Sequence, residues 1–210
     1  MNLEPNSRKE QIFDIAVRMI AQNGFENVSM RDIAAQAGIT AASIYNHFAS
    51  KEEMLSAIYE YFGKLRVDQR KDTSRIQAAV ETGLALDVLT VFLDPAIANY
   101  EEKIALRMVL ISKIVMMRIF NDPRANQFFL HEMFETDMQY MKKWLGYAVE
   151  IGRLEKDFDI DNFSIFYWRQ LIMMGIWAFA DPNYEVRILD EEAVLLHWFA
   201  GMLPLKARPS

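Results

Sequence analysis

The stretch from residue 29 to residue 51 constrains the fold most, because it predicts two short helices joined by a tight turn and followed by a third. Ser29 and Asp32 stand three residues apart, which is the spacing of a capping box at a helix N-terminus. Gly38 supplies a residue that adopts left-handed backbone angles at no steric cost where the first helix must end. The sequence therefore predicts a helix that begins after Ser29 and ends at Gly38.

Thr40 is placed to cap the second helix, whose apolar residues Ile44 and Phe48 lie four apart and so on one face. Small residues at the start of this helix, followed by hydrogen-bonding and aromatic ones, suit insertion into a DNA major groove. The outer face carries Ala41, Ala42, Ser43, Tyr45, Asn46 and His47. The spacing and the chemistry predict a helix-turn-helix.

Residues 8–62 resemble the DNA-binding region of the tetracycline-repressor (TetR) family of bacterial transcriptional regulators. The matching residues are Ile12, Ala16, Gly24, Phe25, Val28, Ser29, Ile33, Ala34, Ala37, Gly38, Ile44, Tyr45, His47, Phe48, Ser50, Lys51, Glu52 and Glu53. The resemblance implies an N-terminal DNA-binding domain and a helical effector-binding domain. The predicted DNA contacts are Arg31, Thr40, Ala41, Ala42, Ser43, Tyr45, Asn46, His47 and Lys51.

These residues have different predicted roles. Arg31 lies in the first turn of its helix, where the family usually has a group that reaches DNA. Tyr45 and His47 look like the family's phosphate-contacting aromatics; the alternative is that their rings only cover the small core. Ser43 and Asn46 are the best side chains for base edges, so direct readout is expected to be modest, with DNA shape and half-site spacing adding selectivity.

A second predicted capping box, Ser50 to Glu53, opens a long helix that continues to Arg70. Lys51 and the free amides of its first turn are expected to clamp a phosphate, the alternative being an ordinary helix cap. We expect residues 1–50 to form the DNA-binding domain, 51–72 a connecting helix, and 73–210 a domain for effector binding and dimerisation.

Composition narrows the class of protein. The net charge is −6, yet residues 1–71 hold nine basic and nine acidic side chains, so DNA affinity must come from a local arrangement and should fall steeply with salt. Hydrophobic residues make up 52% of the chain, which suffices for a packed core, and cysteine is absent. We expect a cytoplasmic protein with no membrane segment, because neither a signal-peptide pattern nor a long apolar run is present.

Beyond residue 73 the pattern changes to long apolar helices separated by proline and glycine. The predicted helices span residues 74–93, 96–120, 124–151, 160–180 and 188–202. No alternating strand pattern competes with them, so we predict an all-α fold of about nine helices: an N-terminal three-helix unit and a larger helical bundle.

The last two predicted helices are apolar on nearly every face, so both sides of each must be covered. The family resemblance implies that they form a dimer interface, whereas the alternative is a thick monomeric core. The predicted interface residues are Ile165, Trp168, Ile172, Gly175, Ile176, Phe179, Val194, Trp198 and Gly201.

The middle helices are rich in adaptable apolar side chains, which suit a pocket for a small hydrophobic or aromatic effector, although such residues are usually core. The candidate pocket residues are Leu89, Phe92, Met108, Met116, Phe128, Met141 and Trp144. Arg107, Arg118, Arg169 and Gln170 are candidates to orient a polar ligand group, or else are solvated or paired.

Enzyme chemistry finds little support in the sequence. His131 and Glu132 match half of a metalloprotease helix, but Glu135 stands where the second histidine is required, and an exposed His–Glu pair is the simpler interpretation. We expect no catalytic residues, no metal site, no cofactor and no enzyme activity.

The sequence therefore predicts a ligand-responsive regulator that binds a palindromic double-stranded DNA operator as a homodimer and is released by a small apolar effector. The family resemblance implies that it is a repressor. Two alternatives stay open. One is a helix-turn-helix regulator controlled by a protein partner or acting constitutively. The other is a helical lipophile-binding or scaffold protein that binds no operator.

Overall fold

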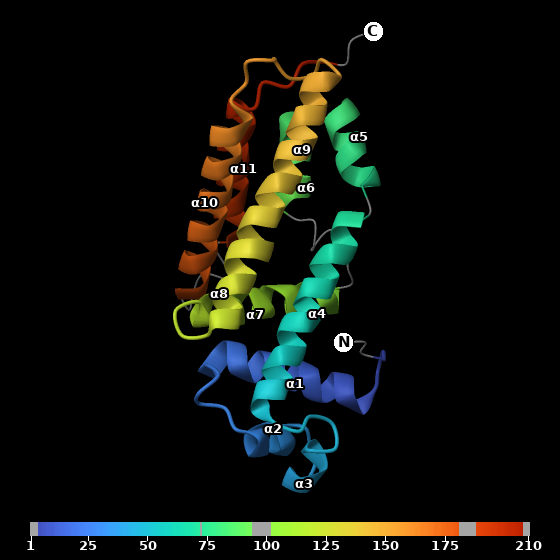
Figure 1. Cartoon of the computed structure of the whole chain (residues 1–210), viewed down its shortest axis with the longest axis vertical. Coiled ribbons are helices and arrows are strands. Elements are labelled where there is room, and N and C mark those ends of the chain that lie inside the picture. The colour runs from blue at the N-terminus through green and yellow to red at the C-terminus, as the bar shows by residue number, and fades with distance from the viewer. Residues whose placement is uncertain (1–3, 72, 94–101, 181–187, 208–210) are drawn as a thin grey trace. The chain divides into compact units, whose positions relative to one another are not determined.

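The computed structural model describes residues 4–71, 73–93, 102–180 and 188–207, in which helices are joined by turns and irregular segments (Figure 1). No strand occurs among these residues, so the predicted all-α class is confirmed. None of the helices in these ranges is long and apolar enough to cross a lipid bilayer. The elements are α1 (Arg8–Asn23), α2 (Met30–Gln36), α3 (Ala41–Ile44), α4 (Lys51–Lys71), α5 (Ser74–Thr82), α6 (Ala85–Leu93), α7 (Glu102–Arg118), α8 (Pro123–Phe128), a π-helix (Phe129–Glu135), α9 (Thr136–Glu150), α10 (Ile160–Ala180) and α11 (Ile188–Met202).

The described ranges hold more helical segments than the nine expected, and one reason is a break inside the helix predicted at 74–93. Gly83 ends α5, where its N–H bonds the Ala79 carbonyl at 2.8 Å. The Asp87 carboxylate then accepts the Leu84 N–H at 2.6 Å and so satisfies one of the free amides at the start of α6.

The helix predicted at 124–151 also differs. It runs as α8, the π-helix and α9 with no gap between them. Such π-helical turns inside longer helices are rare and often lie at functional positions. The helices predicted at 160–180 and 188–202 are found with those bounds, whereas the predicted start of the helix at 96–120 lies outside the described residues.

The chain divides into two compact units. Unit 1 comprises residues 1–68 and 99–130, and unit 2 comprises residues 69–98 and 131–210. Helices α7 and α8 therefore belong with the N-terminal helices, although they fall within the range 73–210. The range 73–210 was predicted from the change to long apolar helices, and its assignment to effector binding and dimerisation stays a prediction.

In unit 1, the apolar faces expected from helical spacing are buried. Ile12, Ile33, Ile44, Phe48 and Leu55 are all at most 1% exposed, and they come from α1, α2, α3, the turn after α3 and α4. Burying each such side chain contributes about 1.5–3 kcal/mol. This small core holds the helix-turn-helix together.

A buried charged cluster joins α7 to α1 within the same unit. The Arg107 Nη2 atom lies 2.6 Å from Glu10 Oε1 and 2.9 Å from Asp14 Oδ2, and Nη1 donates to the Tyr61 hydroxyl at 3.1 Å. Lys103 Nζ lies 3.0 Å from the other Glu10 oxygen. Arg107 is therefore paired inside the protein and is not free to orient a ligand.

This cluster makes the stability of the protein depend on pH. Burial by itself would raise the pKa of Glu10, but hydrogen bonds from Arg107 and Lys103 outweigh burial and lower the pKa to about 2, from 4.5. Because the folded pKa is the lower one, the charged carboxylate stabilises the fold above about pH 4.5 and loses this effect as the pH falls towards 2.

Glu10→Gln is therefore expected to lower the free energy of unfolding at pH 7 by about 2–3 kcal/mol. The deficit relative to the parent protein should shrink at pH 3, measured by urea unfolding with circular dichroism. Glu4→Gln, which changes an exposed carboxylate in the same segment, is the control. A Glu10→Gln deficit that is equal at pH 7 and pH 3 would contradict the pKa assignment.

Unit 2 has its own core, which is built from α5, α6, α9, α10, α11 and the segments that follow α9 and α11. Its buried residues are Ile76, Ala79, Val80, Val88, Leu89, Phe92, Met141, Trp144, Leu145, Ala148, Leu154, Phe163, Tyr167, Leu171, Leu196, Phe199 and Leu203. Buried Arg153 donates to the carbonyls of Val80, Gly83 and Lys206 at 3.1, 2.7 and 2.8 Å. It thereby ties the end of α5 to the C-terminal segment.

Candidate functional site

The turn between α2 and α3 has the geometry that its residues predict. The Ser29 hydroxyl accepts the Asp32 N–H at 3.2 Å, and the Asp32 carboxylate accepts the Ser29 N–H at 2.9 Å, so the predicted capping box is confirmed. Hydrogen bonds from the hydroxyl and the N–H of Ser29 hold the pKa of Asp32 below its ordinary value. Gly38 adopts φ 65°, the left-handed conformation expected at the end of this helix.

The backbone around Gly38 completes a Schellman motif. Its N–H bonds the Ala35 carbonyl, and the Ile39 N–H bonds the Ala34 carbonyl, each at 3.0 Å. These bonds satisfy carbonyls that the end of α2 leaves free and turn the chain sharply into α3.

Helix α3 is short and presents most of its outer face to solvent. The Thr40 hydroxyl accepts the Ser43 N–H at 3.1 Å and caps the helix as predicted. It also lies 2.8 Å from the Ser43 hydroxyl, so a contact between Ser43 and a base must compete with this bond. The exposed candidates are Thr40, Ala41, Ala42, Tyr45 and Asn46, while Ser43 and His47 are half-buried.

The basic residues near the outer face of α3 differ in whether they have partners within the protein. Arg31 is exposed, and no hydrogen bond or ion pair within the described ranges involves it. Arg8, by contrast, donates to the Ala37 carbonyl at 2.7 Å, and Lys9 Nζ lies 5.0 Å above the Phe48 ring. Both therefore help to hold the helix-turn-helix together.

Lys51, at the start of α4, also has an internal partner. Its Nζ donates to the Phe25 carbonyl at 2.9 Å and lies 4.3 Å from the centre of the Phe25 ring. An ammonium group carries three donors, so two remain for other acceptors. The phosphate clamp assigned to Lys51 stays a prediction.

The second predicted capping box is formed with one changed partner. The Ser50 hydroxyl accepts the Glu53 N–H at 3.0 Å, as expected. The Glu53 carboxylate, however, accepts from the N–H of Ala49, one residue earlier than a capping box requires. Its negative charge still lies at the start of α4, where it is favourable for the helix dipole.

Phe25 is contacted by cations on two helices of unit 1. The Arg118 guanidinium, in the last turn of α7, lies 4.3 Å from the centre of the ring that Lys51 also contacts. Arg118 further pairs with Glu26 at 3.1 Å and with Asp122 at 3.5 Å. Sequence reasoning missed this junction, because Arg118 and Phe25 lie more than ninety residues apart and only packing brings them together.

An exposed apolar surface lies on α10 and α11 in unit 2. Its residues are Phe166, Met173, Ile176 and Trp177 on α10 and Val194, Trp198 and Met202 on α11, with exposed fractions between 39% and 71%. We call this set the apolar stripe. Phe166 and Trp198 contact each other edge to face, with ring centres 5.6 Å apart, and so join its two halves.

The predicted interface residues only partly coincide with this stripe. Ile176, Val194 and Trp198 belong to it, and Gly201 is exposed, so that a Cβ there would meet no atom beyond its chain neighbours and its own helix backbone within 4 Å. The half-buried members of the prediction are Ile165, Trp168, Ile172 and Gly175. The Phe179 side chain lies outside the described residues. Phe166, Met173, Trp177 and Met202 were missed, although the i, i+7 and i+11 spacing on α10 could have indicated the first three.

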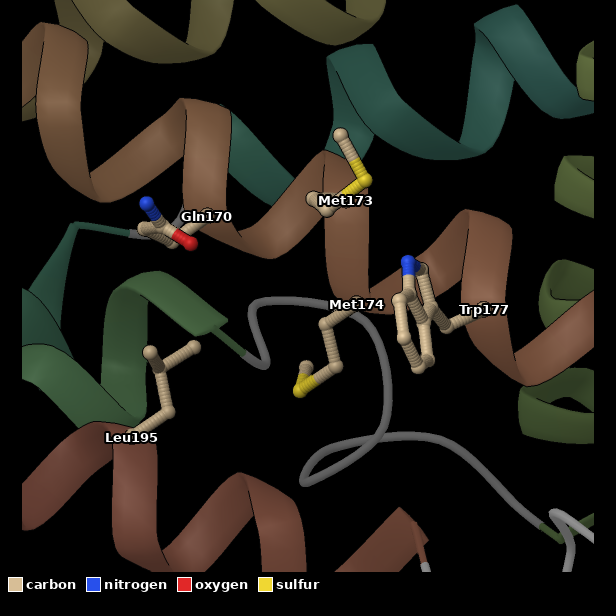
Figure 2. Close-up of a pocket in the computed structure, with 5 residues that line it drawn as sticks. All are labelled: Gln170, Met173, Met174, Trp177 and Leu195. Carbon is tan, nitrogen blue, oxygen red and sulfur yellow. The ribbon is translucent and has the colours of Figure 1, made fainter.

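The seven predicted pocket residues are divided between the two compact units, and the pocket assigned to them stays a prediction. Leu89, Phe92, Met141 and Trp144 are buried in the core of unit 2. Met108, Met116 and Phe128 lie in unit 1, where the Phe128 ring stacks on Phe62 at 5.3 Å. The physical reason is that α7 and α8 pack in the other unit, which helical periodicity alone cannot reveal. None of the seven lines the depression that Gln170, Met174 and Leu195 border in unit 2 (Figure 2).

The His131 and Glu135 side chains contact each other at 3.1 Å on the surface of the π-helix. Within the described ranges, no group of three or more potential metal ligands is found.

Known proteins resemble this chain in sequence and in fold. The family model for bacterial regulatory proteins of the tetR family matches residues 12–58. The HTH-type transcriptional repressor KstR2 of Mycobacterium tuberculosis strain H37Rv is 28% identical over 159 residues, which are 74% of this chain and 74% of that protein.

Two solved structures of regulators share the fold. The ketosteroid transcriptional regulator KstR2 of Mycobacterium tuberculosis has a TM-score of 0.55 and 20% identity, covering 93% of this chain and 96% of that one. A transcriptional regulator from Saccharomonospora viridis in complex with choline has a TM-score of 0.67 and 17% identity, covering 94% and 97%.

Proposed function

Because the chain belongs to the TetR family of transcriptional regulators, we propose that it is a repressor that binds a palindromic operator as a homodimer and is released by a small apolar or aromatic effector. The observation that carries the proposal is the capped, solvent-facing start of α3. The similarity to the repressor KstR2 supports repression as opposed to activation.

The chemistry of α3 supports readout from the major groove. Ala41 and Ala42 leave room for base edges and can contact thymine methyl groups, while Asn46 carries an exposed amide suited to adenine. We assign phosphate contacts to Arg31 and Tyr45, both of which are exposed. Because each copy has few polar side chains that can bind base edges, selectivity depends on a second copy. That copy binds about one turn of the DNA helix, or roughly 34 Å, away.

The apolar stripe supports the homodimer. Contiguous exposed apolar surface rich in tryptophan is typical of protein interfaces. A two-fold dimer buries the same stripe on both copies and so explains why α10 and α11 are apolar on their outer faces.

Two features of the fold support release by an effector. Helix α4 is continuous, and its end is held in unit 2 by Arg70, which pairs with Glu132 and Asp137 at 3.0 Å each. Its start contacts Phe25 through Lys51 in unit 1. A ligand that shifts the last turn of α4 therefore changes the support of the helix-turn-helix, and effector and operator oppose each other through linkage.

Operator binding by Arg31 and Asn46 variants tests the proposed contacts. Arg31→Ala is expected to weaken binding to all sequences alike and to reduce the slope of log affinity against log salt by about 1. Asn46→Ala is expected to relax selectivity at one base pair, with a loss of about 5-fold to 100-fold for the preferred sequence. Fluorescence anisotropy with an operator selected from random DNA measures both the salt slope and the loss of selectivity.

Lys156→Ala removes one exposed positive charge from unit 2 and is the control for net charge. A salt slope that Arg31→Ala leaves unchanged would contradict the phosphate contact. Failure of the purified protein to select any DNA would favour the scaffold alternative, and selection of DNA without any response to small molecules would favour control by a protein partner.

A further inference from the structure

The last turn of α7 lies against the loop between α1 and α2. The Arg118 guanidinium lies 4.3 Å from the centre of the Phe25 ring, and its Nη1 atom donates to the Glu26 carboxylate at 3.1 Å. Met117 approaches the same loop, since its methyl carbon lies 3.9 Å from where a Cβ on Gly24 would be. All of these residues belong to unit 1, so the contact is internal to one compact part of the chain.

Arg118 is itself held by a second carboxylate. Its Nε atom lies 3.5 Å from Oδ2 of Asp122, a residue that is only 5% exposed. Asp122 also caps α8 by accepting the Arg124 N–H at 2.9 Å, so its place is fixed by the start of that helix. Because anions pair with Arg118 from both the loop and α8, its guanidinium keeps a fixed position beside the Phe25 ring.

Phe25 in turn holds Lys51 through both its carbonyl and its ring. Lys51 Nζ donates to the carbonyl at 2.9 Å and lies 4.3 Å from the ring centre. The hydrogen bond uses one of three donors and leaves two for other acceptors. Ordering a lysine side chain costs conformational entropy, so an ammonium that is already fixed binds a further acceptor at a lower cost.

The charge of Arg118 acts on the same place. Glu26 follows Phe25 directly in the chain, and its side chain is 79% exposed. Removing Arg118 leaves the Glu26 carboxylate without this partner, one residue from the carbonyl that Lys51 binds. There the negative charge attracts the ammonium and repels an incoming phosphate.

We propose that Arg118 is a positioning residue for DNA binding: through Phe25 and Glu26, it holds the Lys51 ammonium where its two remaining donors bind one phosphate. Describing the acceptor as an operator phosphate rests on the proposed function, whereas the dependence of the Lys51 position on Arg118 does not. The last turn of α7 therefore takes part in DNA binding without contacting DNA.

Operator binding as a function of salt separates positioning from a general structural role. Lys51→Ala should reduce the slope of log affinity against log salt by about 1 for each bound copy, because it removes one phosphate contact. Arg118→Gln should remove most of the same slope and weaken binding about threefold to tenfold for each copy. The double variant should bind no more weakly than Lys51→Ala alone, because both changes remove the same contact.

Two variants are matched controls. Arg118→Lys keeps a cation beside Phe25 and Glu26, so it should lose less affinity than Arg118→Gln at every salt concentration. Arg124→Gln removes another arginine that pairs with Asp122, at 3.1 Å, and whose interactions among the described residues do not include Phe25. It should leave the salt slope unchanged. Circular dichroism verifies the fold of each variant.

Nuclear magnetic resonance of the free protein tests the positioning without DNA. In protein with isotopically labelled lysine, the Phe25 ring should shift the ε-methylene protons of Lys51 upfield, and this shift should shrink in Arg118→Gln. If Arg118→Gln does not fold, Phe25→Leu is the second variant, since it removes the ring and retains the carbonyl. It should reduce the salt slope in the same way.

Three results would each overturn the proposal. They are losses that add in the double variant, a salt slope that Arg118→Gln leaves intact, and a Lys51 shift that Arg118→Gln leaves unchanged. A parent protein that selects no operator would instead contradict the proposed function, and the Lys51 shift would still decide whether Arg118 positions the ammonium.

Discussion

Trp198→Glu is expected to convert the protein from dimers into monomers and to abolish operator binding at concentrations where the parent binds. Trp198 lies at the centre of the α11 half of the apolar stripe and contacts Phe166 of α10 edge to face. A carboxylate at this position would be buried without a partner in the dimer, which costs several kcal/mol. Sedimentation velocity at micromolar concentration measures the change of state.

Operator affinity should fall together with dimerisation. Two linked recognition helices gain about 100-fold to 10,000-fold over a single one, because the second binds at high effective concentration. A monomer is therefore expected to lose at least about 100-fold in affinity even though its α3 surface is intact.

Leu84→Glu is the matched control for this prediction. Leu84 is an exposed leucine of the same unit, between α5 and α6 and outside the apolar stripe. It should leave both the dimer and operator binding intact. A Trp198→Glu protein that remains dimeric would contradict the interface assigned to α10 and α11.

Arg107→Met is expected to destabilise unit 1 by about 3–5 kcal/mol, because it removes the buried cation that pairs with Glu10 and Asp14 and leaves only the half-exposed Lys103 beside them. The loss should appear in hydrogen exchange of the α1 amides and in urea unfolding followed by circular dichroism. All four tryptophans lie in unit 2, so tryptophan fluorescence reports on the other unit and is expected to change less.

Two further variants isolate the role of the buried charge. Lys103→Met removes a half-exposed partner of the same Glu10 carboxylate and should cost no more than about 1 kcal/mol. Neutralising Glu10 and Asp14 together with Arg107→Met should recover much of the stability, because no unpaired buried charge remains. A deficit below about 1 kcal/mol for Arg107→Met alone would contradict the assigned cluster.

The local parts of the candidate site follow from short-range rules. The cap at Ser29, the left-handed Gly38 and the cap at Thr40 depend on residues within about five positions of one another, and the structure has all three. The bounds of α10 and α11 are also as predicted, because apolar spacing and proline breaks act over a single helix.

The contacts between distant segments did not follow from the sequence. The sequence alone is equally compatible with a solvated, a paired or a ligand-binding Arg107. Only the packing of α7 beside α1 shows that it is paired. The contact between the Lys51 ammonium and the Phe25 ring likewise depends on how α4 packs against a residue 26 positions earlier. The depression between α10 and α11 depends on how two helices pack, and helical periodicity marks only which face of each is apolar.

The sequence by itself determined the all-α class, the helix-turn-helix and the apolar character of the last two helices, because caps, glycine turns and periodicity act through neighbouring residues. Only the tertiary structure decided that α7 and α8 belong to the compact unit of the DNA-binding helices. It also decided that Arg118 and Lys51 share one aromatic ring and that an open depression lies beside the apolar stripe. The physical reason is that long-range pairing depends on complementary shape and charge between segments, which no local pattern encodes.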